Sequence, residues 1–227
     1  MLLFVNRINN LMSILSKYDL FIFDWDHTLT KSTLLLTLMA LTVRKARSGR
    51  IERSIEKRRD ARVSEKAIRN IKIDESFSKL YSYFDDIYSF IFRPRLKDNA
   101  ADLLELLKKR RKKVAVFSDS KTYRLLKETS MLGVLRYVDF ALSAESIGYY
   151  KPDPTGLLVL VDKFGVSKKR CLYIGDLPTD ILTARLAGID SCGVADGIGK
   201  FDSLKKANPN YLFTHMDSLF QNLRKRR

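Results

Sequence analysis

Two acidic residues two positions apart follow a short apolar segment. Asp24 and Asp26 come directly after the run Leu20–Phe23, and a polar turn at 27–30 follows them. Like charges held close together disfavour each other's ionisation, so a buried pair of this kind costs free energy. A metal cation and a phosphoryl group next to the two carboxylates would offset that cost. The pair therefore predicts metal-assisted chemistry on a phosphate, provided that other segments supply the remaining groups.

Further polar residues that suit such a site stand at or just beyond the ends of later apolar segments. These residues are Ser118, Asp119, Lys151, Asp176 and Asp180. A serine hydroxyl and a lysine ammonium can bind phosphoryl oxygens, and additional carboxylates can hold a magnesium ion. Each residue alone is a weak signal, because single serines, lysines and acids are more often structural. Together they indicate a phosphate site, because they occur in order along the chain and all stand at or near the ends of apolar segments.

Strand-like and helix-like segments alternate over most of the chain. The expected strands are 20–23, 113–118, 137–142, 170–175 and 189–194. The expected helices are 99–111, 120–131, 154–164 and 179–187. This alternation predicts an α/β fold, with a parallel sheet covered by helices on both faces. In such a sheet, ligands bind beyond the carboxyl ends of the strands, so polar residues from distant segments would meet at one edge.

Residues 32–92 have a different composition. Gly49 is their single glycine, they contain no proline, and charged residues are frequent. Apolar residues recur at three-to-four spacing through 81–91, which predicts helices. We therefore expect a core domain formed by 1–31 and 93–227, and a small helical domain at 32–92 inserted after the first strand.

Four short motifs occur in order along the chain. They are DxDxT at Asp24–Thr28, the strand-ending Ser118, Lys151, and GDxxxD at Gly175–Asp180. In this order and setting, the chain resembles the phosphohydrolases of the haloacid dehalogenase superfamily. The Lys-Pro-Asp-Pro run that begins at Lys151, together with the early insertion, resembles the branch of phosphoglycolate phosphatase and β-phosphoglucomutase. The resemblance implies a Rossmann-like three-layer core with a helical cap domain, which would be segment 32–92.

The resemblance also implies roles for the acidic residues. Asp24 would be the nucleophile that attacks phosphorus and forms an aspartyl-phosphate. Asp26 would donate a proton to the leaving oxygen and later accept one from the hydrolytic water. Mg²⁺ would be held by Asp24, the backbone carbonyl of Asp26 and Asp176, while Asp180 would bind the metal or orient its waters.

The other motif residues would bind the phosphoryl group or support the site. The Ser118 hydroxyl and the backbone N–H groups around Asp119 would contact phosphoryl oxygens. Lys151 would neutralise charge between the phosphate and the nucleophile, and Thr28 would brace the turn.

Two residues inside the first motif leave alternatives open. His27 stands where many relatives carry glycine, and it is either a turn residue or a substrate contact. Trp25 either contacts the leaving group or shields the site from water.

These residues favour a Mg²⁺-dependent phosphatase acting on a small phosphomonoester such as phosphoglycolate, a sugar phosphate or a nucleotide. Asp26 argues against a dehalogenase, which needs no acid for an alcohol leaving group. A phosphomutase stays open, because it would use the same carboxylates. A second class of function also stays open, namely a basic nucleic-acid-binding or regulatory protein on the same scaffold.

The chain carries a formal net charge of +16 over 227 residues. The basic excess is concentrated in segments 44–72, 108–113 and 224–227. This concentration of positive charge favours anionic partners, namely phosphorylated metabolites, nucleic acid or anionic lipid. Solvated basic side chains are also common on surfaces without a partner, so the charge alone selects none of these.

The remaining composition bears on location. No apolar stretch approaches the roughly 20 residues needed to span a bilayer, so no transmembrane segment is expected. Cys171 and Cys192 form no CxxC pair and lie in expected strands, which predicts free thiols and a cytoplasmic protein. Phe4, Ile8 and Leu11 share one helical face, which predicts an N-terminal helix that docks on the core or, alternatively, binds a membrane or a partner.

Overall fold

The computed structural model describes residues 14–31 and 94–224. The chain divides into two units, Met1–Lys31 with Pro94–Arg227 and Ser32–Arg93, and the described residues belong to the first. The predicted helical domain at 32–92 lies outside the described residues and stays a prediction. The same holds for the predicted N-terminal helix that contains Phe4, Ile8 and Leu11.

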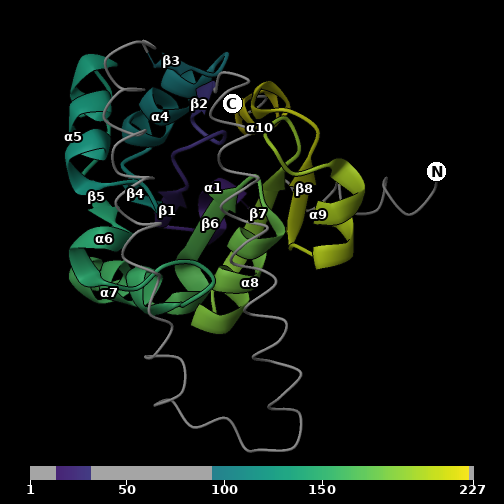
Figure 1. The fold of residues 1–227 in the computed structure, drawn as a ribbon. Coiled ribbons are helices and arrows are strands. Elements are labelled where there is room, and N and C mark those ends of the chain that lie inside the picture. The colour runs from purple at the N-terminus through teal and green to yellow at the C-terminus, as the bar shows by residue number, and fades with distance from the viewer. Residues whose placement is uncertain (1–13, 32–93, 225–227) are drawn as a thin grey trace, which may run out of the picture. The chain divides into compact units, whose positions relative to one another are not determined.

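Six parallel strands among the described residues form one sheet, which confirms the predicted α/β fold (Figure 1). The strands are β1 Leu20–Phe23, β4 Lys113–Ser118, β5 Phe140–Ser143, β6 Cys171–Gly175, β7 Asp190–Val194 and β8 Tyr211–Phe213. Their order across the sheet is β5-β4-β1-β6-β7-β8. All four side chains of β1 are buried. A strand covered on both faces needs apolar residues throughout, and the sequence of β1 supplies them.

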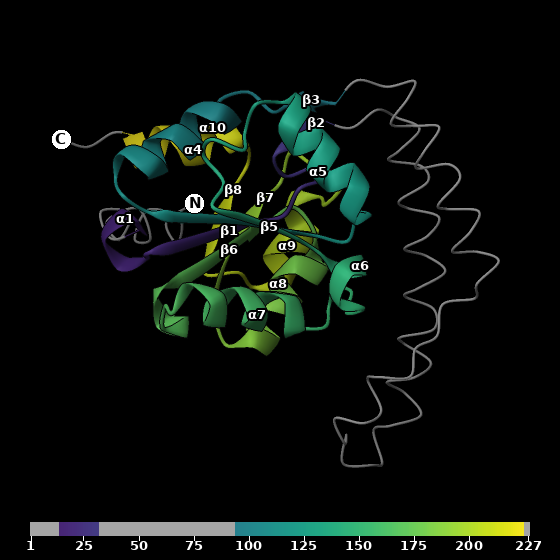
Figure 2. The same cartoon turned by 90° about the vertical axis from the view of Figure 1, so that its left-hand side faces the viewer.

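Helices cover both faces of this sheet (Figure 2). They are α1 Ile14–Lys17, α4 Ala100–Lys109, α5 Thr122–Met131, α6 Ala144–Ile147, α7 Thr155–Phe164, α8 Pro178–Ala187, α9 Phe201–Ala207 and α10 Met216–Arg224. Phe21 and Phe23 pack in one apolar cluster with α4 and α10. Leu20 and Ile22 pack in a second cluster with α7 and α8. Alternate side chains of β1 thus join opposite layers, as the two-residue period of a strand requires.

The parallel register brings the ends of β4, β1 and β6 to the same edge of the sheet. Phe23 of β1 pairs with Val116 of β4 and with Ile174 of β6. The backbone N–H of Asp24 donates to the carbonyl of Ile174 at 2.8 Å. Asp24 therefore emerges from the sheet between the last residues of two neighbouring strands.

A separate antiparallel ladder joins β2 (Thr30–Lys31) to β3 (Arg95–Leu96). Thr30 lies opposite Leu96, and Lys31 lies opposite Arg95. β2 ends the first described stretch of the chain, and β3 lies at the start of the second. Two-residue strands carry no periodic pattern, so the sequence did not predict this ladder.

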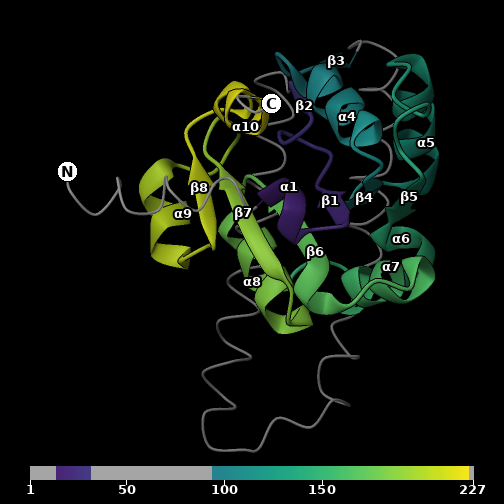
Figure 3. The same ribbon diagram turned by 180° about the vertical axis from the view of Figure 1, so that it is seen from behind.

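Two parts of the sheet differ from the predictions. β5 begins at Phe140 rather than at 137, because the N–H groups of Tyr137 and Val138 both donate to the carbonyl of Val134 in a turn. Beyond the last predicted strand, β8 extends the sheet next to β7, and α9 and α10 flank it in the sequence (Figure 3). β8 has three residues, too few for a recognisable pattern.

No helix within residues 14–31 and 94–224 is long and apolar enough to cross a membrane. Cys171 and Cys192 are free and buried, as predicted. Burial raises the pKa of the Cys171 thiol to about 11, so the thiol is protonated at neutral pH.

Candidate active site

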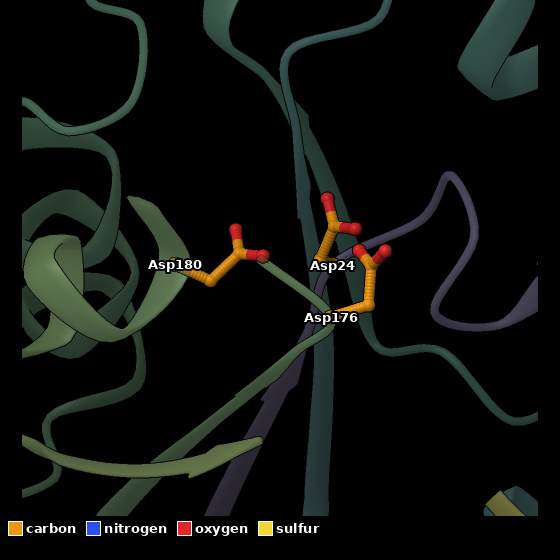
Figure 4. A group of neighbouring side chains, drawn as sticks. All are labelled: Asp24, Asp176 and Asp180. Atoms are coloured by element: carbon orange, nitrogen blue, oxygen red, sulfur yellow. The ribbon is translucent and has the colours of Figure 1, made fainter. Parts of the chain in front are cut away.

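Three buried carboxylates meet at the carboxyl edge of the sheet (Figure 4). Asp24 follows β1, Asp176 follows β6, and Asp180 lies in the first turn of α8. One oxygen from each of the three lies within 4.8 Å of the others. Across the described parts of the chain, no other group of three His, Cys, Asp or Glu side chains has this arrangement. The structure therefore brings together three of the predicted site residues from two distant motifs.

Lys151 supplies a positive charge inside this cluster. Its Nζ lies 2.6 Å from Oδ1 of Asp24 and 2.8 Å from Oδ1 of Asp180. The lysine comes from the loop between α6 and α7, beyond the end of β5. Its backbone N–H donates to Oδ1 of Asp119 at 3.1 Å, so the Asp119 side chain binds the loop that carries Lys151.

Burial and mutual repulsion shift the ionisation of the cluster. Burial raises the pKa of Asp24 well above its usual range; Lys151 opposes this shift, and the charges of Asp180 and Asp176 add to it. Burial together with the charge of Asp180 raises the pKa of Asp176 to about 7. For Lys151, burial favours the neutral amine, but attraction to Asp180 and Asp24 outweighs burial and raises the pKa of the ammonium. The cluster thus lacks positive charge relative to its carboxylates.

The donor set fits a hard divalent cation. Three carboxylates face one ammonium group, which leaves room for two more positive charges when all three are ionised. Carboxylate oxygens are the ligands that Mg²⁺ prefers, and Mg²⁺ commonly takes one or two protein carboxylates and completes its shell with water and phosphate. The raised pKa values of Asp24 and Asp176 are what ligands without their cation would show.

Asp180 is held in place by its surroundings. Its Oδ2 accepts the backbone N–H of Leu177 at 2.9 Å, and its Oδ1 accepts the Tyr173 hydroxyl at 3.2 Å. A Cβ atom at Gly175 would lie 2.4 Å from the Cβ of Asp180, so the glycine of this motif leaves the space that the Asp180 side chain fills. Sequence reasoning gave Tyr173 no role, because within the run Cys171–Gly175 it looks like one more buried strand residue.

Thr28 links the two strand-end carboxylates. Its hydroxyl oxygen lies 2.9 Å from Oδ2 of Asp24 and 3.2 Å from Oδ1 of Asp176, and the residue is fully buried. A hydroxyl has one hydrogen to donate, so it can serve one of the two carboxylates at a time unless the other is protonated. Thr28 stands in a turn closed by the N–H of Leu29, which donates to the carbonyl of Trp25 at 3.1 Å.

The side chain of Asp26 does not join the three carboxylates. It forms an ion pair with Arg124 of α5 and accepts a hydrogen bond from the Ser120 hydroxyl. Ser120 in turn lies 2.7 Å from the hydroxyl oxygen of Ser118, so Ser118 connects to Asp26 through Ser120. Burial favours the neutral acid, but Arg124 and Ser120 outweigh burial and lower the pKa of Asp26.

A buried pair beneath Asp26 was missed by sequence reasoning. Nε of Arg124 donates to Oε1 of Glu128 at 2.9 Å, and the indole N–H of Trp25 donates to Oε2 of Glu128 at 2.7 Å. Trp25 is fully buried and binds Glu128 through its polar edge. The four-residue spacing of Arg124 and Glu128 indicates an ion pair on a helix, but it does not reveal that the pair is buried under Asp26.

His27 adopts a left-handed backbone conformation, with φ 64°. Glycine adopts this left-handed conformation without steric strain, whereas most other residues are strained in it. The backbone conformation therefore explains why a glycine suits this position. The side chain is 8% exposed, and burial lowers the pKa of its imidazole to about 4. His27 is thus a residue of the turn and is neutral at pH 7.

Comparisons with known proteins agree with this geometry. PpaX of Clostridium perfringens, described as a candidate pyrophosphatase, is 29% identical over 109 residues, 48% of this chain and 51% of its own length. Phosphoglycolate phosphatase of Haemophilus influenzae is 28% identical over 119 residues, 52% of this chain and 53% of its own length. The match thus spans about half the length of these curated relatives.

A solved structure and a family model extend the comparison. A haloacid dehalogenase-like hydrolase candidate from Bacteroides fragilis aligns with a TM-score of 0.68 and 26% identity, over 89% of this chain and 100% of that chain. The family model of haloacid dehalogenase-like hydrolases matches residues 18–188, a range that contains all four motifs. Since this match covers most of the sequence and every residue of the carboxylate cluster, the chain belongs to the haloacid dehalogenase-like hydrolases.

Proposed function

We propose that the protein is a Mg²⁺-dependent phosphatase that hydrolyses a small phosphomonoester through an aspartyl-phosphate on Asp24. The observation that carries this proposal is the buried group of Asp24, Asp176 and Asp180 with the ammonium of Lys151 between two of its members. A carboxylate poised beside a cation-binding group, at the edge where an α/β sheet takes its ligands, can attack a phosphate dianion.

Asp24 and Asp176 would hold the magnesium ion, together with the backbone carbonyl of Asp26. Mg²⁺, when bound, would neutralise the phosphoryl oxygens and so allow a carboxylate to approach them. Asp180 already accepts hydrogen bonds from Lys151, Tyr173 and the N–H of Leu177, so its role would be to fix Lys151 and to orient metal-bound water.

The chemistry would proceed in two displacements. An oxygen of Asp24 attacks phosphorus while the bond to the ester oxygen breaks, and that oxygen takes a proton from Asp26. The negative charge of the bound phosphoryl group would raise the pKa of the Asp26 carboxyl, which Arg124 and Ser120 lower in the free protein, so that the carboxyl carries this proton. The ionised Asp26 then removes a proton from water, whose oxygen attacks phosphorus and releases phosphate and the free Asp24 carboxylate. The Ser118 hydroxyl, the N–H of Asp119 and the ammonium of Lys151 would bind the phosphoryl oxygens in both steps.

The substrate would be a small anionic molecule such as phosphoglycolate, a sugar phosphate or a nucleotide. The names of the two curated relatives make phosphoglycolate and pyrophosphate the first compounds to test. Segment 32–92 would form the cap that closes over the bound substrate and selects it. Two buried free thiols support a reducing compartment, which we propose to be the cytoplasm.

The test is hydrolysis of an aryl phosphate with Mg²⁺ and with a chelator. We expect turnover that needs the metal and that Asp24→Asn abolishes. Asp19→Asn is the matched control, because Asp19 precedes the same strand at the opposite edge of the sheet and should leave turnover unchanged. A panel of phosphorylated metabolites would then rank the substrates.

Two other functions give different results in the same assay. A phosphomutase would retain the phosphoryl group on its product and release little inorganic phosphate. A nucleic-acid-binding protein would show no metal-dependent turnover and tight binding of DNA or RNA that weakens steeply with salt. Either result would overturn the phosphatase proposal.

A further inference from the structure

The loop after β7 reaches back to the carboxylate of Asp176. We call residues Asp196–Gly199 the glycine loop. The backbone N–H of Ile198 in this loop donates to Oδ2 of Asp176 at 2.7 Å. The other oxygen of the same carboxylate, Oδ1, faces the Thr28 hydroxyl at 3.2 Å. Each oxygen of Asp176 therefore has its own neighbour, and together these two contacts fix the plane of the carboxylate.

The glycine loop lies directly against Asp176 with no space for side chains. A Cβ atom at Gly197 would lie 2.1 Å from Oδ2 of Asp176. A Cβ atom at Gly199 would lie 1.8 Å from the backbone oxygen of Asp176. Both distances are far shorter than any contact between non-bonded atoms, so glycine at these two positions permits the approach.

The first residue of the glycine loop is anchored from two sides. Oδ1 of Asp196 forms an ion pair with Nζ of Lys97, and the same Nζ lies 2.7 Å from the backbone oxygen of Asp196. Oδ2 of Asp196 accepts the N–H of Met216, the first residue of α10, at 2.9 Å. The Lys97 side chain is 8% exposed and that of Asp196 is 18% exposed. Water therefore screens this pair little, and the pair holds the loop firmly.

Lys97 also contacts the turn of the first motif. Its backbone N–H donates to the carbonyl of Leu29 at 2.9 Å, one residue after Thr28. The two groups that contact the Asp176 carboxylate, Thr28 and the N–H of Ile198, thus stand on two segments that Lys97 joins. A shift of either segment would turn the Asp176 carboxylate.

We propose that Lys97 and Asp196 are positioning residues that set the affinity for the divalent cation by fixing the orientation of Asp176. This inference rests on the part of the proposed function that assigns Mg²⁺ to Asp176. Neither residue touches the substrate or the reacting atoms. Residues that orient a metal ligand typically change metal affinity about 10- to 100-fold when they are mutated.

The test measures Mg²⁺ binding by titration calorimetry on the full chain, and separately the Mg²⁺ concentration that gives half-maximal turnover. Lys97→Gln and Asp196→Asn should each raise the Kd for Mg²⁺ by about tenfold or more. Lys97→Arg keeps the charge and should recover most of the affinity. At saturating Mg²⁺, kcat of the variants should return close to the wild-type value. Lys17→Gln is the control. It also removes a lysine–aspartate ion pair, with Asp190, but that pair lies at the amino ends of the strands, away from Asp176.

The outcomes separate this inference from the proposed function. Folded Lys97→Gln and Asp196→Asn that bind Mg²⁺ with the wild-type Kd would overturn the inference, whether or not the protein is a phosphatase. A wild-type protein that binds no Mg²⁺ would also overturn it. If Mg²⁺ binds and the variants weaken it, but no phosphate ester is hydrolysed, the proposed function fails while the inference stands. Circular dichroism shows whether each variant folds. If Lys97→Gln does not fold, the Kd of Asp196→Asn for Mg²⁺ decides the test.

Discussion

Nζ of Lys151 lies 2.6 Å from Oδ1 of Asp24 and makes a second contact of 2.8 Å with Asp180. The lysine side chain is 7% exposed, so both contacts lie away from bulk water. The positive charge of this buried ammonium relieves repulsion between the two acids in the folded protein. In the proposed reaction, the same charge would also face a phosphoryl oxygen.

Replacing Lys151 by methionine should therefore harm both stability and activity. We expect kcat to fall by roughly 10²- to 10³-fold, since one preorganised charge on the phosphoryl group is lost. In a chelator, the free energy of unfolding of the variant should also be lower by about 3 kcal/mol, because Asp24 and Asp180 stay buried without the ammonium of Lys151. Urea unfolding and steady-state kinetics measure the two effects. Lys168→Met changes an exposed lysine and serves as the control; equal losses in both variants would contradict the assignment.

Asp26→Asn should slow hydrolysis in proportion to how poor the leaving group is. An alkyl phosphate needs a proton on its leaving oxygen and should lose about 10²- to 10⁴-fold in turnover. The aryl oxide of an activated aryl phosphate leaves as a stable anion without a proton. The rate of aspartyl-phosphate formation from this substrate should therefore fall much less. Burst kinetics with aryl phosphates separate this step from the later attack of water. Equal losses for both substrates in the first step would show that Asp26 is not the leaving-group acid.

Asp176→Asn should stabilise the metal-free protein at high pH while it weakens Mg²⁺ binding. The folded pKa of Asp176 is about 7, above its ordinary value of 3.8. Its contribution to stability is therefore fully present below the ordinary pKa and is lost as pH rises through about 7. Asparagine resembles the neutral acid at every pH, so the variant should gain roughly 4 kcal/mol at pH 8 and progressively less toward pH 5. Urea unfolding in a chelator at both values checks this; a gain that grows toward pH 5 would contradict it.

His27→Asn should make the protein more resistant to acid. The folded pKa of His27 is about 4, below its ordinary value of 6.5. The unfolded chain therefore binds a proton more readily, and the contribution of His27 is present above pH 6.5 and is lost as pH falls toward 4. Asparagine tolerates the left-handed backbone and does not titrate. Between pH 7 and pH 5, the wild type should lose about 2 kcal/mol more stability than the variant. Parallel losses in both proteins would assign the acid sensitivity to other groups.

The sequence predicted the sheet and the strand-end residues because both follow from short-range patterns. The run Leu20–Phe23 is buried on both faces, so its apolar character shows in the sequence alone. Asp24, Ser118 and Asp176 stand at strand ends, and the parallel arrangement then places them at one edge of the sheet. Lys151 was singled out with them, although it reaches the cluster from a loop beyond β5 and not from a strand end.

What the sequence could not predict depends on contacts between distant segments. Arg124 and Glu128 look like an ordinary surface pair on a helix until Trp25 is seen to cover Glu128. The glycine loop looks like any turn until Gly197 is placed against Asp176. These residues carry no motif of their own, because their function comes from what lies next to them in space.

The ladder between β2 and β3 makes the chain length between its two strands nearly irrelevant to the core. Lys31 and Arg95 are paired, so the two chain ends that meet there are held together whatever the length of the sequence between them. The entropy of closing a loop grows slowly, by about 0.6 kcal/mol for each doubling of its length. A change in the length of the sequence between these two residues should therefore cost the core little stability, while the three carboxylates at the edge of the sheet keep their geometry.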